Sequence, residues 1–134
     1  MRKSAVGVLL LLVAGCTGQQ DLSKADEAVA KFHNNLNGQQ YERIYATSDQ
    51  GLKAAAPKAD AVKLFSAVHQ KLGDYQSGKR TGWRANYNTS GNNLVVEYQS
   101  KFDHGDATET FTFVGPDKAL RLFGYNINSA ALIP

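Results

Sequence analysis

The ionisable residues that could carry out acid–base chemistry are few, and none of them forms a familiar catalytic motif. Glu109 shares a predicted strand face with Phe111 and Phe113, and His69 lies on the apolar stripe of a predicted helix. A carboxyl or imidazole group in an apolar cavity could act as a general base. The residue pattern favours a plainer interpretation, in which Glu109 is solvated at a strand edge, His69 packs with local partners and His33 is solvated. No residue is therefore predicted to be catalytic.

A second possible chemistry is metal binding at the run Asp103-His104-Gly105-Asp106, which offers three potential ligands in four residues. Histidine and carboxylate side chains do bind transition metals. A hairpin tip, with its tight turn at His104-Gly105, explains the same residues through turn chemistry. The sequence therefore predicts no metal site, and it contains no phosphate-binding loop or other sign of a cofactor.

A basic stretch surrounds the single tryptophan, Trp83. Strict alternation along a strand would place Lys79 and Trp83 on one face and Arg80 and Arg84 on the other. A solvated sheet face explains the arginines. The functional alternative is contact with an acidic partner or with a lipid headgroup.

The chemistry of Cys16 is better defined, because cysteine sulfur is a nucleophile that can carry a thioether-linked lipid. Cys16 directly follows Leu12-Val13-Ala14-Gly15, and the segment before it begins with the basic residues Arg2 and Lys3. This arrangement resembles the lipobox of bacterial lipoproteins. The apolar run of roughly ten residues is too short to span a bilayer, which takes roughly 20. The resemblance implies that residues 1–15 are a cleaved signal peptide and that Cys16 is lipidated.

Lipidation would make the membrane a partner of this protein, because two or three acyl chains anchor a chain stably. Residues 16–23 would then be the lipidated cysteine and a short polar tether, and residues 24–134 the folded domain. Thr17 follows the cysteine where the usual inner-membrane retention signal has aspartate. We therefore expect export and membrane anchoring, at the outer membrane facing the periplasm if the source is Gram-negative.

Composition limits the classes of partner and the sources of stability. Removing Arg2 and Lys3 with the signal reduces 15 basic residues to 13, against 12 acidic ones. This near-neutral balance argues against nucleic-acid binding by charge. The only cysteine is the lipidated one, so no disulfide can form and stability must come from packing. A domain of roughly 110 residues is long enough to bury one core.

Hydrophobic periodicity changes once along the chain, from a helical period to a period of two. Helices are predicted from an N-cap at Ser23 to Gly38, over residues 40–47 and over residues 58–72, with a short helical turn ending near Ala56. Strands are predicted over residues 75–87, 94–103, 108–113 and 120–128, the last with Phe123, Tyr125 and Ile127 on one face. Consecutive hairpins make the sheet antiparallel, and the helices must cover one of its faces. The fold class is therefore α+β.

The strand motifs resemble those of an uncharacterised family of small bacterial lipoproteins and exported proteins in the nuclear-transport-factor-2-like (cystatin-like) superfamily. They are Gly73-Asp74-Tyr75-Gln76-Ser77, Val95-Val96-Glu97-Tyr98-Gln99-Ser100-Lys101-Phe102, Glu109-Thr110-Phe111-Thr112-Phe113 and Leu122-Phe123-Gly124-Tyr125-Asn126-Ile127. The resemblance implies a curved four-stranded sheet wrapping the N-terminal helices into a cone. It supplies a fold and not a mechanism. Candidate ligand-binding residues inside the cone are Tyr98, Phe111, Phe113, Phe123 and Tyr125.

Three functions remain open at this point. The first is a lipid-anchored binding or accessory module of the cell envelope, for a partner protein or a small apolar ligand held in the cone. The second is an isomerase- or hydratase-type enzyme, which would need an ionisable group buried at the cavity floor with a hydrogen-bonded partner. The third is a structural envelope component, which a filled interior would favour.

Overall fold

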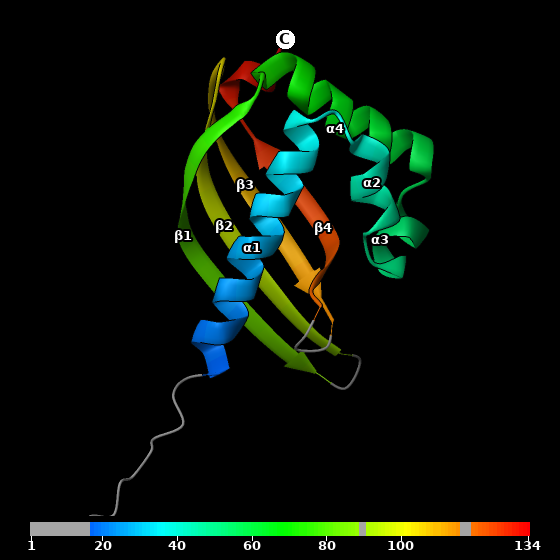
Figure 1. The fold of residues 1–134 in the computed structure, drawn as a ribbon, viewed down its shortest axis with the longest axis vertical. Helices are drawn as coiled ribbons and strands as arrows, with labels where there is room; N and C mark the ends of the chain where they lie inside the picture. Colours follow the sequence, from blue (N-terminus) through cyan, green and yellow to red (C-terminus); the bar gives the residue numbers. More distant parts are fainter. Residues whose placement is uncertain (1–16, 89–90, 116–118) are drawn as a thin grey trace, which may run out of the picture.

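The computed structural model describes residues 17–88, 91–115 and 119–134 of the 134-residue chain (Figure 1). The predicted signal segment, Cys16 and most of the predicted turn at residues 115–118 lie outside the described residues. Within the described part, no helix is both long and apolar enough to cross a membrane.

The described chain forms helices first and strands second, as the change of period predicts. The helices are α1 (Thr17–Asn37), α2 (Tyr41–Ala46), α3 (Gln50–Ala55) and α4 (Lys58–Leu72), and a single 3₁₀ turn, η1 (Ala130–Leu132), follows the last strand. The strands are β1 (Tyr75–Asn88), β2 (Gly91–Phe102), β3 (Gly105–Val114) and β4 (Arg121–Asn128), paired antiparallel in the order β1-β2-β3-β4. The predicted α+β class, with N-terminal helices on a four-stranded antiparallel sheet, is confirmed.

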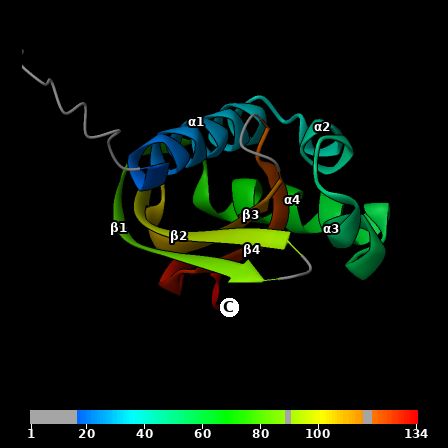
Figure 2. The same cartoon turned by 90° about the horizontal axis from the view of Figure 1, so that it is seen from below.

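The sheet is curved and open, and α1 lies across its concave face (Figures 1 and 2). The other three helices gather toward the β4 side, where α3 contacts β4 and α2 contacts α4. The core lies between α1, α4 and the concave face. Its buried apolar side chains are Ala25, Val29, Phe32, Leu36, Ile44, Leu52, Ala61, Phe65, Val68, Leu72, Leu94, Val96, Tyr98, Phe102, Ala107, Phe111, Phe113 and Leu122.

The start of α1 differs from the sequence-based expectation. The helix begins at Thr17, so the predicted N-cap at Ser23 is wrong and residues 17–22 are helical. Leu22 explains the extension, because it packs partly against the core and continues the apolar stripe one turn before Ala25. The other helix ends agree with the predicted ranges to within one residue. Asp49 caps α3, and Gly73, at φ 75°, ends α4.

Two bulges in β1 change which of its side chains lie on the concave face of the sheet, compared with the prediction from strict alternation. Register shifts lie between Tyr75 and Ser77 and between Arg80 and Gly82, so each adds an unpaired residue. Between the bulges the even-numbered residues face the helices, and Arg80 pairs with the buried Tyr98. The predicted separation of Arg80 from Trp83 is therefore wrong, because both lie on the concave side of β1.

A bulge in β4 has the same effect on Phe123. Phe113 pairs with Leu122 and Thr112 with Gly124, so Phe123 has no partner on β3. Its side chain is 43% exposed and turns away from Tyr125, while Leu122 takes the inward position. Phe123 lies over α3, where a Cβ on Gly51 would come within 2.2 Å of its ring. The predicted inward facing of Phe123 is wrong.

Candidate functional site

A buried polar cluster sits in the centre of the concave face, where the sequence indicated none. Glu109 is fully buried, and one carboxylate oxygen lies 2.7 Å from Nε2 of His33 on α1. Its other oxygen accepts a 2.6 Å hydrogen bond from the hydroxyl of Tyr125 on β4. The predictions that Glu109 is solvated at a strand edge and that His33 is solvated are both wrong.

The packing of α1 explains why these two side chains are inside. The buried residues of β3 alternate, so Glu109 faces the same way as Phe111 and Phe113. Because α1 lies against the concave face of the curved sheet, the sheet also buries side chains of α1 that lie beside its apolar stripe. His33, next to Phe32, therefore becomes 98% buried, and its ring stacks on Tyr75 with centroids 3.5 Å apart.

The environment of Tyr125 shows how apolar this cluster is. Burial, followed by the charge and the hydrogen bond of Glu109, raises the pKa of Tyr125 well above its ordinary value. Tyr125 therefore keeps its hydroxyl hydrogen and donates it to Glu109. The Tyr125 ring also packs against Phe32, with centroids 4.7 Å apart, and against Phe111 at 5.2 Å.

A hollow of about 410 Å³ opens between α1 and β1 beside this cluster. We call it the α1–β1 hollow. Arg80 pairs with Asp26 there at 3.1 Å, and the buried Tyr98 hydroxyl also donates to Asp26. Burial, then the hydrogen bond to Asp26, raises the pKa of Tyr98, so it remains a donor. The lining residues are Asp26, Val29, Ala30, His33, Tyr75, Gly78, Arg80 and Tyr98.

A second hollow of about 500 Å³ lies on the other flank of α1, toward α2 and the ends of β3 and β4. We call it the α1–α2 hollow. Phe113 and Leu122 belong to its apolar surface, and Lys31 and Arg43 carry positive charge on its exposed rim. In the described part of the chain, neither cation forms an ion pair. The lining residues are Ala28, Lys31, Phe32, Asn34, Asn35, Arg43, Ile44, Thr47, Phe113, Leu120 and Leu122.

The five predicted ligand-binding residues are thus not brought to one site. Phe113 lines the α1–α2 hollow and Tyr98 lines the α1–β1 hollow. Phe111 is fully buried in the core, stacked on Phe113 at 6.0 Å. Tyr125 is half-buried beside it, and Phe123 faces away. Lys31 and Arg43 also line the α1–α2 hollow, and the sequence did not predict this. The sequence pattern of an exposed lysine or arginine does not depend on whether the side chain borders a hollow.

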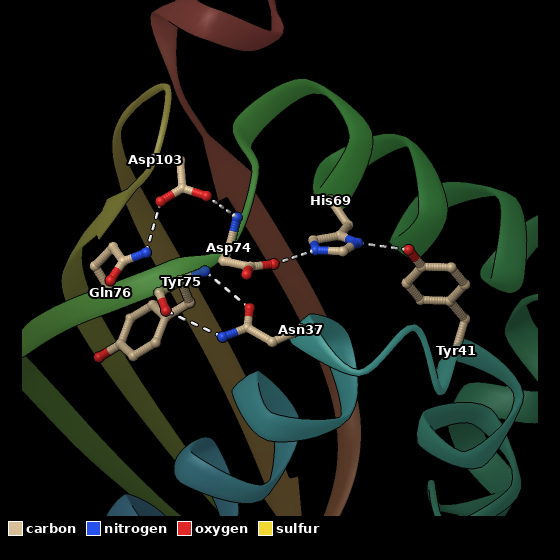
Figure 3. Close-up of polar contacts among 7 residues, drawn as sticks. All are labelled: Asn37, Tyr41, His69, Asp74, Tyr75, Gln76 and Asp103. Carbon is tan, nitrogen blue, oxygen red and sulfur yellow. Dashed lines mark hydrogen bonds and ion pairs between the residues drawn. The ribbon is translucent and has the colours of Figure 1, made fainter.

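His69 belongs to a separate polar network at the top of the sheet, as Figure 3 shows. Its Nδ1 lies 2.7 Å from the hydroxyl of Tyr41, and its Nε2 lies 2.6 Å from the carboxylate of Asp74. The prediction that its ring nitrogens find local partners is confirmed. Burial, then the charge of Asp74, raises the pKa of Tyr41, so this arrangement does not produce a tyrosinate nucleophile. The network holds α4 to the α1–α2 corner.

Asp103, at the tip of the β2–β3 hairpin, ties this tip to the start of β1. The turn is Asp103-His104, one residue earlier than predicted. Asp103 accepts hydrogen bonds from the Asp74 amide at 2.9 Å and from the Gln76 side chain at 2.6 Å (Figure 3). These bonds, the amide bond first, lower the pKa of Asp103. No cluster of three or more potential metal ligands occurs among residues 17–88, 91–115 and 119–134.

The fold and the two hollows define a small α+β domain in which one helix crosses a curved sheet and leaves an open space on each flank. Residues 28–125 match a family described as a protein of unknown function, DUF4019. This match covers most of the chain, and the protein therefore belongs to that family. No curated protein matches the chain.

Proposed function

We propose that this protein is a lipid-anchored binding module of the cell envelope, and that its ligand has an apolar body and an anionic end. The α1–α2 hollow carries the proposal. Its volume of about 500 Å³ falls within the range of roughly 300–1,000 Å³ typical of small-molecule sites. Concave sites of this kind combine apolar walls with a few polar groups that orient the ligand.

The composition of the α1–α2 hollow supports this class of ligand. Phe32, Ile44, Phe113 and Leu122 are all buried core residues that contribute apolar surface to the hollow. An apolar ligand body placed there would gain roughly 25 cal/mol for each Å² removed from water. Lys31 and Arg43 would attract a carboxylate, sulfonate or phosphate at the rim.

The anchor is the second part of the proposal. The lipobox resemblance at Cys16 supports lipidation, and α1 begins at the next residue. The membrane would therefore lie close to the N-terminal end of α1, with little tether between. The helix-on-curved-sheet arrangement also supports the proposed relationship to the nuclear-transport-factor-2-like superfamily.

The experiment is a displacement titration on the chain beginning at Thr17, with 8-anilinonaphthalene-1-sulfonate as the reporter. Laurate should displace the dye, and dodecyltrimethylammonium, which has the same chain but a cationic head, should displace it more weakly. Ala28→Trp should abolish dye binding, because Ala28 lines the hollow and is only half-buried.

Two double variants with the same change of net charge distinguish an effect of the two cations at the rim from an effect of net charge on ligand binding. Exposed ion pairs contribute about 0.2–1 kcal/mol each, so Lys31→Glu with Arg43→Glu should weaken laurate binding about 2- to 30-fold. Lys63→Glu with Lys79→Glu makes the same change of charge at exposed positions outside the hollow. Equal effects in both double variants would contradict the proposal.

The enzyme alternative gains one observation. It required a buried ionisable group with a hydrogen-bonded partner, and Glu109 with His33 meets that requirement. His69, the other candidate acid–base residue, bonds Tyr41 and Asp74 instead. An acid–base role would therefore belong to the α1–β1 hollow. The purely structural alternative is less favoured, because the core is filled while both flanks of α1 remain open.

A further inference from the structure

The α1–β1 hollow has a solvent-accessible ion pair in its wall, which the proposed function does not use. The guanidinium of Arg80 bonds both carboxylate oxygens of Asp26, from Nε to Oδ1 at 3.1 Å and from Nη2 to Oδ2 at 3.3 Å. The Arg80 side chain is 29% exposed and the Asp26 side chain is 45% exposed. Because both residues line the hollow, a ligand there can contact both charged groups.

The two bulges of β1 bring Arg80 to this position. Strict alternation from Tyr75 would turn Ser77 and Lys79 toward the helices, whereas Gly78 and Arg80 line the hollow instead. Beyond the second bulge the predicted facing returns, and Trp83 pairs with a buried residue of β2. The bulges therefore change the facing of β1 only where this strand lines the hollow. Bulges that redirect a side chain are frequent beside functional sites.

The polar groups of the hollow include donors and an acceptor at short range from one another. In bonds to described residues, Arg80 uses two of its five guanidinium N–H groups. The Tyr98 hydroxyl donates to Oδ1 of Asp26, so Oδ2 is the oxygen with more room for a further bond. A Cβ on Gly78 would lie 2.6 Å from the Tyr75 hydroxyl oxygen, so glycine lets this hydroxyl lie against β1. Figure 3 shows the Tyr75 ring pointing away from His69.

The charges around the hollow determine the charge of the ligand that fits. Arg80 and Asp26 are the exposed charged residues among those that line it, and they neutralise each other. An anionic ligand that bonds Arg80 would lie next to the Asp26 carboxylate, and a cationic ligand that bonds Asp26 would lie next to the guanidinium. Each arrangement brings like charges into contact, which is unfavourable. The site therefore favours an uncharged ligand.

The spacing of donor and acceptor selects among uncharged ligands. Nη2 of Arg80 and Oδ2 of Asp26 are 3.3 Å apart, so the ligand must accept and donate at neighbouring positions. A hydroxyl group both donates and accepts at one oxygen, and adjacent hydroxyl groups on a ring repeat this pair. The N–H and C=O of a trans peptide amide point in opposite directions and do not meet this requirement.

We propose that the α1–β1 hollow binds an uncharged polyhydroxyl compound of the size of one sugar ring, with adjacent hydroxyl groups bonded to Arg80 and Asp26. The volume of about 410 Å³ lies in the lower part of the range of small-molecule sites, which suits one ring. Val29 and the rings of Tyr75 and Tyr98 supply apolar surface for the C–H groups of the ligand. This site is distinct from the α1–α2 hollow and does not depend on whether that hollow binds a ligand.

The test is an NMR titration of the full chain in phospholipid nanodiscs, with ¹⁵N-labelled arginine and with Arg80→Lys to identify the Arg80 signal. The ligands are the methyl glycosides of glucose, galactose and mannose. Tetrahydropyran has the same ring without hydroxyl groups, N-methylacetamide is the amide control, and methyl glucuronoside is the anionic analogue of the glucoside. We expect a saturable shift of Arg80 Nε with at least one glycoside, and weaker or no binding of the three controls.

Variants at two exposed alanines locate the response. Ala30 lines the hollow and Ala59 lies on α4, and both side chains are exposed, so neither change disturbs the core. Ala30→Trp should abolish the shift caused by the glycoside, and Ala59→Trp should leave it unchanged.

A matched pair of amide variants tests the charge argument. Asp26→Asn leaves Arg80 without its counter-charge, so the preference for the methyl glucoside over the methyl glucuronoside should fall about 10-fold or more. Glu27→Gln makes the same change of net charge at the next, exposed position and should leave the preference unchanged.

The proposal is overturned if none of the three glycosides gives a saturable shift, or if tetrahydropyran or N-methylacetamide binds as well as the glycosides. Tighter binding of the glucuronoside by the wild-type chain, a response that survives Ala30→Trp, or equal effects of Asp26→Asn and Glu27→Gln would also overturn it.

Discussion

The buried pair of His33 and Glu109 gives the sharpest test of how the centre of this domain is stabilised. Both residues are at least 98% buried, and their side chains are 2.7 Å apart. Removing one partner of a buried ionic pair costs about 3–5 kcal/mol, whereas replacing both by apolar residues is often neutral or stabilising by about 1–4 kcal/mol. The pair should therefore show a large coupling energy in a double-mutant cycle.

The perturbations are Glu109→Leu, His33→Phe and the double variant. Glu109→Leu leaves Nε2 of His33 without a hydrogen-bond partner and also removes the acceptor of the Tyr125 hydroxyl. We expect it to cost about 3–5 kcal/mol. His33→Phe keeps the stack on Tyr75 but leaves Glu109 buried with Tyr125 as its only partner, and we expect a similar loss. The double variant should be within about 2 kcal/mol of wild type.

The assay is urea unfolding followed by circular dichroism, with the slope m compared among variants to confirm that each still unfolds as one unit. A domain of this size has a total stability of about 5–15 kcal/mol, so the single variants should shift the midpoint strongly. Additive effects of the two substitutions, or single losses below about 1 kcal/mol, would refute the claim that the pair is mutually dependent.

Other predictions follow from single positions. Phe65→Ala should cost about 3–5 kcal/mol in urea melts, because Phe65 is 98% buried against Phe32, and a loss below about 1 kcal/mol would contradict this packing. Asp49→Ala should cost about 1 kcal/mol, because Asp49 caps α3, and Asp49→Asn should cost less. The pKa of Asp49 is lowered, mainly by the hydrogen bond from the Gly51 amide and further by Arg121. The charged carboxylate therefore stabilises the fold at pH values above the unfolded-state pKa of Asp49. The advantage of wild type over Asp49→Asn should therefore disappear as pH falls through the folded-state pKa, and an advantage that grows in acid would contradict this. Cys16→Ser should release the protein from the membrane fraction and remove acyl mass from its N-terminus, whereas retention of the variant in membranes would argue against lipid anchoring. Trp83, 55% exposed and the only tryptophan, should be quenched by brominated lipids in the anchored protein, and unquenched emission would place it away from the bilayer.

The expectation for Trp83 depends on how β1 runs beside α1. Asn37, at the C-terminal end of α1, bonds the backbone of Tyr75, and Asp26 bonds Arg80. β1 therefore runs back toward the N-terminal end of α1, and Trp83 lies beyond Arg80 in that direction. If Cys16 is lipidated, this end of the domain faces the membrane.

Periodicity predicted the elements well where the backbone is regular. The helix over residues 58–72 and the antiparallel hairpins follow directly from apolar spacing and from glycine at the ends. Bulges are invisible to such reasoning, because one extra residue changes no composition yet reverses every side chain beyond it. For this reason strict alternation predicts Arg80 on a solvated face and Phe123 in the interior.

The buried cluster was missed for a different reason. Glu109 occupied an inward position in the predicted alternation, so the pattern itself placed it inside. The sequence offers no neighbouring partner for it, and burial of a carboxylate without a partner is costly. The partner, His33, lies 76 positions away and off the main apolar stripe. Only the way α1 sits in the curved sheet brings the two side chains together.

The most direct test of the proposed binding function is to locate a bound ligand in the α1–α2 hollow. Intermolecular nuclear Overhauser effects between laurate and the chain beginning at Thr17 would locate it. We predict contacts from the laurate methylenes to the rings of Phe32 and Phe113, with a chemical-shift change at the Lys31 ammonium. Contacts confined to other surfaces, or none at laurate concentrations below its micelle formation, would contradict the account.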